Sequence, residues 1–440
     1  MTGRVLDRTE ARLLVEARLG HPPEDELEAA VVLEAWAGVP AQAALEVARE
    51  LMPEIPRAPQ PSVGRLPKRR AEQGVLFDEL AFTLTVVAIA FWAAPLTSGL
   101  GVGVVERGLV VALPLTVALQ WAIRCRYLDR PQGVALLAAH RAVLAVGAAW
   151  LVGLLSALLG SAGLLAGLLT VTWTGGTILI RRHRPGVHVA TVILATAAML
   201  AGADALIVVA VAAGLTALAV GAALARPGAA GARRSPGPLE RTAVAAMLGA
   251  GLGLMLVIDD SVSWTAGAVP ALALVPSTIA SFWGGHHLRR LDEAIPGAAL
   301  GVAAGGPSTR GRAAPPLGVL IVAVGRLVLL AGALSVALLA LTPWLGSSAR
   351  GAGVLVGFAL IALATLLVGL LEALGRGAWA LVAIACALAA EVSIRVDGQV
   401  PFPGTGLVAG GAVAVAVAAP MVVVLLTRPA STLATSLWIP

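Results

Sequence analysis

The chain has few of the residues on which soluble and disulfide-bonded proteins depend. Charged residues make up 13% of its 440 positions, whereas soluble globular domains carry roughly 25%, so an ordinary soluble fold is excluded. The two cysteines, Cys125 and Cys386, lie far apart in or beside apolar segments, which indicates neither a disulfide framework nor a metal site. Lysine occurs once, at Lys68, so almost all of the positive charge is arginine.

The formal net charge of +6 follows from the way arginine is distributed between apolar segments. In a soluble protein such an excess would favour nucleic acid as a partner, but in a membrane protein it reflects topology. We therefore expect the lipid bilayer as the partner, and no nucleic acid. A composition rich in Ala, Val, Leu, Gly and Arg is typical of a GC-rich bacterial genome, which favours a bacterial inner (cytoplasmic) membrane.

Twelve apolar stretches, most of them about as long as a membrane-spanning helix, fill the chain after Val75. A hydrocarbon core ~30 Å thick takes about 20 apolar residues of helix to cross, and no soluble fold calls for a dozen such runs in series. The sequence therefore predicts an all-α integral membrane protein with about 12 transmembrane helices. The expected spans are 76–97, 108–123, 142–160, 162–180, 187–203, 205–225, 242–258, 263–283, 317–341, 351–372, 377–394 and 405–427.

Arginine between the spans falls almost entirely on alternate connections, which predicts the topology. A basic linker that ends at Arg70 precedes the first span, so the positive-inside rule places the N-terminus in the cytoplasm. The later connections on that side hold Arg124, Arg126, Arg130, Arg141, Arg181, Arg182, Arg184, Arg226, Arg233, Arg234, Arg241, Arg289, Arg290, Arg310, Arg312, Arg376 and Arg428. The outer connections hold only Arg107, Arg350 and Arg395. Both termini are thus expected to be cytoplasmic.

A polar segment rich in Gly, Pro and Arg divides the twelve spans into two halves of six, which would share orientation and be related by a pseudo-twofold axis along the membrane normal. The expected organisation is a small acidic helical cytoplasmic module at 1–56, a basic Pro-rich linker at 57–75, a first membrane half at 76–225, a cytoplasmic connector at 226–241, a second membrane half at 242–427 and a cytoplasmic tail at 428–440.

The N-terminal module carries eleven Asp and Glu against five Arg, and it lacks the apolar region of a cleavable signal. Helical periodicity predicts helices at Asp7 to Leu19, Glu24 to Ala37 and Gln42 to Met52. The small core expected between them comprises Leu13, Leu14, Val31, Val32, Leu33, Trp36, Leu45, Val47 and Leu51. Because about 50 residues are marginal for an independent domain, we expect residues 1–56 to lean on the membrane domain or on a partner, such as a cytoplasmic protein that docks on them.

The layout of two halves of six is similar to that of two classes of secondary transporter, the major facilitators and the multidrug/oligosaccharidyl-lipid/polysaccharide exporters. The resemblance covers residues 76–427 and is architectural. Facilitators typically have a glycine- and arginine-rich loop after the second span; here the loop from Arg126 to Gly133 has Asp129-Arg130 but lacks the flanking glycine and the second arginine pair. That departure counts against the facilitators, and the exporters have no comparably strict motif.

Arg326 is the candidate substrate-binding residue because it lies about ten residues into the ninth span, which places it near the membrane midplane at ~1.5 Å per residue. A charge at that depth is costly, and no acid is near it in sequence. One interpretation is an anion site in a central cavity, since a guanidinium binds phosphate in bidentate fashion. The other is a structural arginine bonded to backbone carbonyls or to an acid at a membrane end.

The sequence indicates no catalytic residues, no cofactor and no metal, because it has no phosphate-binding loop, no zinc motif and no large outer loop. We therefore expect a transporter or flippase that moves an anionic lipid-linked saccharide or polysaccharide, and no enzyme. The alternative is a non-catalytic membrane scaffold or a subunit of a secretion or export complex. Both expectations fit a multi-pass protein of the bacterial cytoplasmic membrane.

Overall fold

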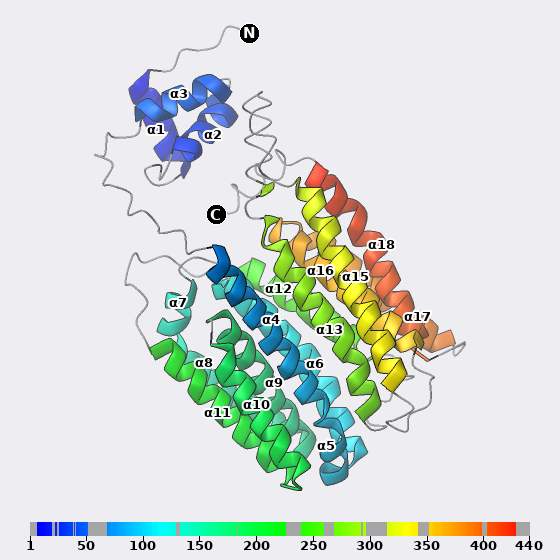
Figure 1. The fold of residues 1–440 in the computed structure, drawn as a ribbon. Helices are drawn as coiled ribbons and strands as arrows, with labels where there is room; N and C mark the ends of the chain where they lie inside the picture. Colours follow the sequence, from blue (N-terminus) through cyan, green and yellow to red (C-terminus); the bar gives the residue numbers. More distant parts are fainter. Residues whose placement is uncertain are drawn as a thin grey trace. The chain divides into compact units, whose positions relative to one another are not determined.

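The computed structural model describes most of the chain, and within the described residues every regular element is a helix. The described residues are 7–19, 23, 26–37, 39, 41–51, 68–128, 133–182, 184–225, 239–258, 268–291, 294–295, 315–341, 352–397 and 403–427. They form two compact units, one within residues 1–74 and the other from Val75 onward (Figure 1). The tail at 428–440 and most of the predicted linker and connector lie outside the described residues.

The N-terminal unit contains the three predicted helices, α1 (Arg8–Leu19), α2 (Glu26–Ala37) and α3 (Ala41–Leu51). Its core is built largely of alanine, because short helices can approach one another closely where the side chains are small. The fully buried side chains are those of Ala11, Val15, Ala29, Leu33, Ala44 and Ala48. The prediction that Leu13 and Trp36 are core residues was wrong, since they are 62% and 46% exposed. The Arg18 guanidinium covers the Trp36 ring instead, 3.9 Å from its centroid.

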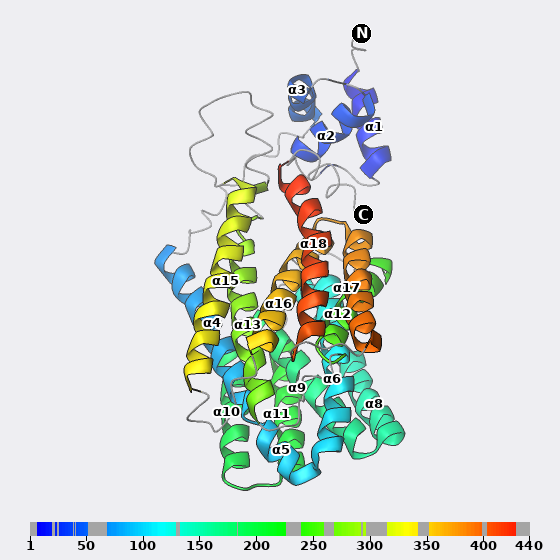
Figure 2. The ribbon, with the colours of Figure 1, turned by 90° about the vertical axis from the view of Figure 1, so that its right-hand side faces the viewer.

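The membrane unit consists of helices that run back and forth beside one another (Figures 1 and 2). In chain order these are α4 (Lys68–Ala90), α5 (Ala93–Leu100), α6 (Val102–Ile123), the π-helical turn η1 (Arg124–Leu128), α7 (Gly133–Ala139), α8 (Arg141–Leu159), α9 (Ser161–Arg181), α10 (Pro185–Leu200), α11 (Ala205–Ala225), α12 (Leu239–Met255), α13 (Ala268–Leu288), α15 (Pro316–Leu341), α16 (Ala352–Ala373), α17 (Gly377–Asp397) and α18 (Thr405–Thr427).

Nine segments among the described residues are long and apolar enough to cross a membrane, which makes the chain a multi-pass helical membrane protein. They are Leu76–Leu100, Val102–Leu128, Arg141–Leu159, Ser161–Arg181, Ala205–Ala225, Pro316–Leu341, Ala352–Ala373, Gly377–Asp397 and Thr405–Thr427. Helices α10, α12 and α13 occupy the other three predicted positions; α10 is apolar but has only 16 residues. Each of the twelve predicted spans therefore overlaps a helix, and the first overlaps two, α4 and α5.

Several helix boundaries differ from the predicted spans, and two of them change where a charged residue lies. Helix α6 begins at Val102, six residues earlier than expected, so Glu106 and Arg107 lie in its first two turns and not in a connection. The exposed Arg107 side chain bonds to the carbonyl of Gly103 one turn earlier, which satisfies it at the helix end. Helix α12 begins at Leu239, so Arg241 belongs to a helix and not to the predicted connector.

Helices α9 and α16 are the hubs of the membrane unit. Helix α9 packs against α6, α8, α10 and α11, and α16 packs against α13, α15, α17 and α18. In each hub, 67% of the most apolar stretch is buried, a larger share than in any other candidate span among the described residues. Apolar side chains form one large core cluster around each hub, and α6 contributes to both clusters.

Helices α6 and α12 pack together closely because α12 presents glycine on the contact face. A methyl group on Gly249 would come within 2.9 Å of the Ala118 backbone, and one on Gly253 would overlap the backbone of Pro114. Residues four apart lie on the same face of a helix, so these two glycines let the two backbones approach as small residues do in other membrane helices. We call this contact the glycine seam.

Helix α8 shows how the outer surface suits lipid. None of its side chains is buried, and many of its large apolar side chains are exposed. The most exposed of them are Val143, Val146, Trp150, Leu154 and Leu158, at 51% to 73% exposure. So large an apolar surface is stable only in contact with hydrocarbon, which embeds the unit in a lipid bilayer.

Candidate functional site

Arg326 lies on α15 at the edge of the face that packs into the bundle. Ala323, one turn before it, and Leu327, directly after it, are almost completely buried. The Arg326 side chain is 34% exposed and forms an ion pair with Glu79 of α4, with 3.6 Å between Nη2 and Oε1. The Glu79 side chain is itself only 3% exposed. No acid lies near Arg326 in the sequence, but the fold brings one, Glu79, from the first predicted span.

Helix α13 supplies the other neighbours of this guanidinium. Arg326 Nη1 lies 3.5 Å from Nδ1 of His287, and its central carbon lies 5.8 Å from the centroid of the Trp283 ring. The adjacent residue His286 is within electrostatic range of both Arg326 and Arg181, the last residue of α9. Two helices distant in sequence, α4 and α13, thus contact one arginine of α15. We call Glu79, Trp283, His286, His287 and Arg326 the Arg326 cluster.

Side chains connect α4 and α13 just beyond this cluster. The rings of Phe82 and Phe282 are stacked, with centroids 4.0 Å apart, and Trp283 Nε1 donates a long hydrogen bond of 3.4 Å to Thr83 Oγ1. These contacts are made by large side chains, whereas the glycine seam is made by backbone. We call this contact between α4 and α13 the aromatic seam.

The Glu79 ion pair leaves hydrogen-bonding capacity on both partners. At 3.6 Å the contact is electrostatic and too long for a hydrogen bond. Among the described residues Glu79 Oε1 has no hydrogen-bond partner, and a guanidinium offers five donors. Arg326 therefore has donors to offer an incoming anion, and a phosphate group accepts such donors in pairs.

The depth predicted for Arg326 changes once its partners are known. Glu79 is in the first turn of the apolar part of α4, and His287 is the penultimate residue of α13. Side chains on a helix lean toward its N-terminus, so the guanidinium extends back from the middle of α15 toward that end. It lies nearer the helix ends than the midplane that counting residues along α15 predicted.

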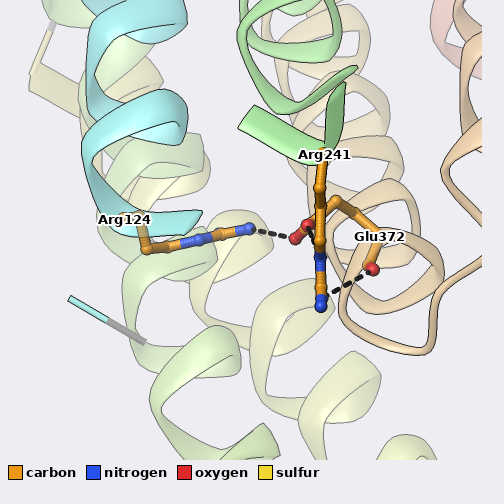
Figure 3. A network of polar contacts seen from close by, with 3 residues as sticks. All are labelled: Arg124, Arg241 and Glu372. Carbon is orange, nitrogen blue, oxygen red and sulfur yellow. Dashed lines mark hydrogen bonds and ion pairs between the residues drawn. The ribbon is translucent and has the colours of Figure 1, made fainter. Parts of the chain in front are cut away.

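A second charged cluster joins helices that are far apart in sequence. Glu372, near the end of α16, accepts a hydrogen bond of 3.0 Å from Arg124 and one of 3.2 Å from Arg241 (Figure 3). Its carbonyl lies 3.4 Å from Arg241 Nη2 as well. Arg124 directly follows α6, and Arg241 is in the first turn of α12, so this triad closes one end of the glycine seam.

The Glu372 carboxylate is paired on both of its oxygens, unlike the Glu79 carboxylate of the Arg326 cluster. The Glu372 side chain is 3% exposed, and each of its carboxylate oxygens accepts from a different arginine. The Arg124 guanidinium also lies over the Trp121 ring, 4.6 Å from the centroid. The sequence alone did not identify the two arginines that Glu372 binds.

Other polar side chains in the bundle bond to neighbouring helices or to their own backbone. Thr172 and Thr177 bond to backbone carbonyls one turn earlier in α9, and Thr170 bonds to Thr116 of α6. Such bonds are typical of threonine in membrane helices and satisfy the hydroxyl without a ligand. His188, which sequence reasoning passed over, is buried in α10 against Gly176 of α9.

No group of three or more metal-ligating side chains occurs in the part of the chain that the structure describes. No family model, curated protein or solved structure matches this chain. What the fold establishes is a multi-pass helical membrane protein with two charged clusters, one whose carboxylate is paired on both oxygens and one whose carboxylate makes a single, looser ion pair.

Proposed function

We propose that the protein is a transporter of flippase type, which moves an anionic lipid-linked saccharide across the membrane with Arg326 contacting its phosphate. The observation that supports this most is the Arg326 cluster itself. A guanidinium with unused donors lies where three helices meet, beside a seam made of side chains. A phosphate ester would satisfy donors that Glu79 leaves unused.

The packing supports two similar halves of six helices each. In chain order α9 is the fourth predicted span and α16 is the tenth, and each packs against the second, third, fifth and sixth spans of its own half; α16 also contacts α12, the first span of its half. This correspondence is what a parallel internal repeat produces, with an axis along the membrane normal. Transporters built from repeats work by rocking one half against the other around a site between them.

The two seams between these halves are suited to different roles. At the glycine seam, small residues allow α6 and α12 to touch along their backbones, and the Glu372 triad joins them at one end. At the aromatic seam, α4 and α13 touch through ring stacking and one long hydrogen bond. The glycine seam therefore serves as the pivot, and the aromatic seam as the side that separates to admit a lipid.

The two charged clusters occupy corresponding places in the two halves. The triad uses the end of the second span, the start of the seventh and the end of the tenth. The pseudo-twofold axis would relate these positions to the end of the eighth span, the start of the first and the end of the fourth. These three places hold His286, Glu79 and Arg181, respectively. Arg326 is an addition from the ninth span and brings an extra positive charge to the aromatic seam.

Reconstitution into proteoliposomes tests this proposal. The substrate is a fluorescent polyprenyl phosphosugar, a phosphodiester with one fixed negative charge, and quenching from outside reports how much lies in each leaflet. We expect wild-type protein to accelerate movement between leaflets, Arg326→Leu to abolish it and Arg326→Lys to retain part of it, because lysine keeps the charge but loses the bidentate fork. Phosphatidylcholine with the same fluorophore should move no faster than in protein-free vesicles.

Arg107→Leu is the matched control, because Arg107 is an exposed arginine bonded only to a carbonyl of its own helix among the described contacts. It should transport like wild type. If wild-type protein moves no probe, or if Arg326→Leu moves it at the wild-type rate, the transporter proposal fails. The chain is then better described as a non-catalytic scaffold or export-complex subunit, whose two charged clusters hold helices together.

A further inference from the structure

We infer that Glu79 couples transport to protons: it exchanges its partner Arg326 for one proton each time the anionic substrate binds. This inference rests on the proposed function and adds its energy source. Glu79 is a buried carboxylate at the first span whose ion-pair partner is the very arginine assigned to the substrate. The Glu79 carboxylate and the substrate phosphate thus compete for the same guanidinium.

The geometry favours exchange over simultaneous binding. The Glu79 side chain is 3% exposed, and Arg326 is the only positively charged group in the described structure that forms an ion pair with it. The contact, at 3.6 Å, is looser than the bonds of 3.0 and 3.2 Å that fix Glu372 between its two arginines. A phosphate that takes two donors of Arg326 in bidentate fashion makes the stronger contact and displaces the weaker one.

A buried carboxylate that loses its counterion does not stay charged. The cost of holding an unpaired ion in an apolar environment is larger than the cost of binding a proton, so the group is neutralised. The charge then balances: one phosphodiester anion replaces one carboxylate beside Arg326, and one proton enters. When the anion leaves, Arg326 returns to Glu79 and the proton is released on the same side as the substrate.

Other ionisable groups near this pair are Asp78 beside Glu79 on α4, His286 and His287 on α13, and Arg181 on α9. Arg289 and Arg290, which follow α13, act electrostatically on the two histidines. His287 is the main competitor for the proton, because its Nδ1 faces Arg326 at 3.5 Å. It differs from Glu79 in one respect: a protonated histidine would repel Arg326, whereas a protonated Glu79 leaves the guanidinium to the substrate. Binding of the anion therefore favours the proton on Glu79.

The test uses the same proteoliposomes with the membrane potential held at zero by valinomycin and equal potassium, and a pH difference of about one unit across the membrane. Because the probe carries a fixed charge, its own titration does not contribute. Coupling of one proton to one anion predicts that wild-type protein enriches the probe in the leaflet facing the alkaline side by up to about tenfold per pH unit. Glu79→Gln should move the probe but leave it equally distributed.

His287→Asn is the comparison variant and should retain the enrichment. If wild-type protein moves the probe but leaves it evenly distributed under the pH difference, or if enrichment is lost in His287→Asn and kept in Glu79→Gln, the inference is overturned while the transporter proposal stands. If wild-type protein moves no probe at all, the proposed function fails first. A Glu79→Gln variant that moves no probe would also overturn the inference, because it would show that the carboxylate is needed for movement and not for coupling.

Discussion

Replacing Glu372 with glutamine removes a charge from the centre of the triad and keeps its shape. The carboxylate is 3% exposed, and it accepts from Arg124 at 3.0 Å and from Arg241 at 3.2 Å. Removing one partner of a buried ion pair costs ~3–5 kcal/mol, because the remaining charge is left uncompensated. The side chains of Arg124 and Arg241 are 25% and 31% exposed, so solvent relieves part of this cost. We expect a loss of roughly 3 kcal/mol, about 150-fold in the unfolding equilibrium.

Equilibrium unfolding of the purified protein in mixed micelles, with increasing dodecyl sulfate, measures this loss. Double-mutant cycles of Glu372→Gln with Arg124→Gln and with Arg241→Gln should each give a coupling energy of about 0.5–3 kcal/mol, as expected for residues in one network. Arg107→Gln, which removes an exposed arginine of α6, should stay within about 0.5 kcal/mol of wild type.

The result that would refute the reasoning is a Glu372→Gln variant as stable as Arg107→Gln. Glu372 would then contribute nothing to holding α6, α12 and α16 together. A second refuting result is a normal loss in the single variant with coupling energies near zero, since the cost would then come from glutamine itself and not from the lost ion pairs. Either result would remove the reason for treating the glycine seam as the pivot.

Three further predictions concern packing, topology and the N-terminal unit. Gly253→Ala should destabilise the protein by about 1–3 kcal/mol in the same unfolding assay, because the methyl group meets the backbone of α6, while Gly103→Ala, where the added group meets nothing, should cost no stability. In a background without the native cysteines, Ser235→Cys or Ser308→Cys should react with a membrane-impermeant reagent only after the cells are opened. Labelling of either cysteine in intact cells would refute the predicted topology. Deleting residues 1–56 should leave membrane insertion intact, as measured by carbonate extraction, because the compact membrane unit begins at Val75; a deletion that is not inserted would show that the module belongs to the membrane fold.

The number and positions of the helices could be predicted because the bilayer imposes their length. Apolar runs of about 20 residues are rare elsewhere, and arginine marks their ends, so each of the twelve predicted spans overlaps a helix, and nine segments among the described residues are long and apolar enough to cross a membrane. Helix boundaries could not be predicted where charged residues lie within the first or last turns of a helix. Glu106 and Arg107 signalled a connection, yet both lie in α6, because a polar residue in a first turn can extend beyond the hydrocarbon while the helix continues.

The N-terminal core shows a limit of hydrophobic pattern. Large residues such as Leu13 and Trp36 carry the stronger apolar signal, but the close packing of three short helices selects alanines, whose signal is weak. Which face of α1 turns inward depends on how near α2 and α3 approach. Periodicity within one helix does not contain that information.

The partners of Arg326 and Glu372 could not be predicted because they come from helices that only the tertiary fold brings together. Arg124 is 248 residues from Glu372, and Arg241 is 131 residues from it. One signal for Glu79 was available: topology places the start of the first span and the start of the ninth on the same side of the membrane. That restricted the choice of acid without specifying which helices touch.

Photocrosslinking locates the substrate and so tests most directly the claim that Arg326 binds its phosphate. A polyprenyl phosphosugar with a diazirine next to the phosphate is added to the protein in vesicles and activated, and the labelled peptides are identified by mass spectrometry. The account predicts labels on α4, α13 and α15 around Glu79, Trp283 and Arg326, which are lost in Arg326→Leu and kept in Arg107→Leu. Labels confined to other helices, or an unchanged pattern in Arg326→Leu, would contradict it.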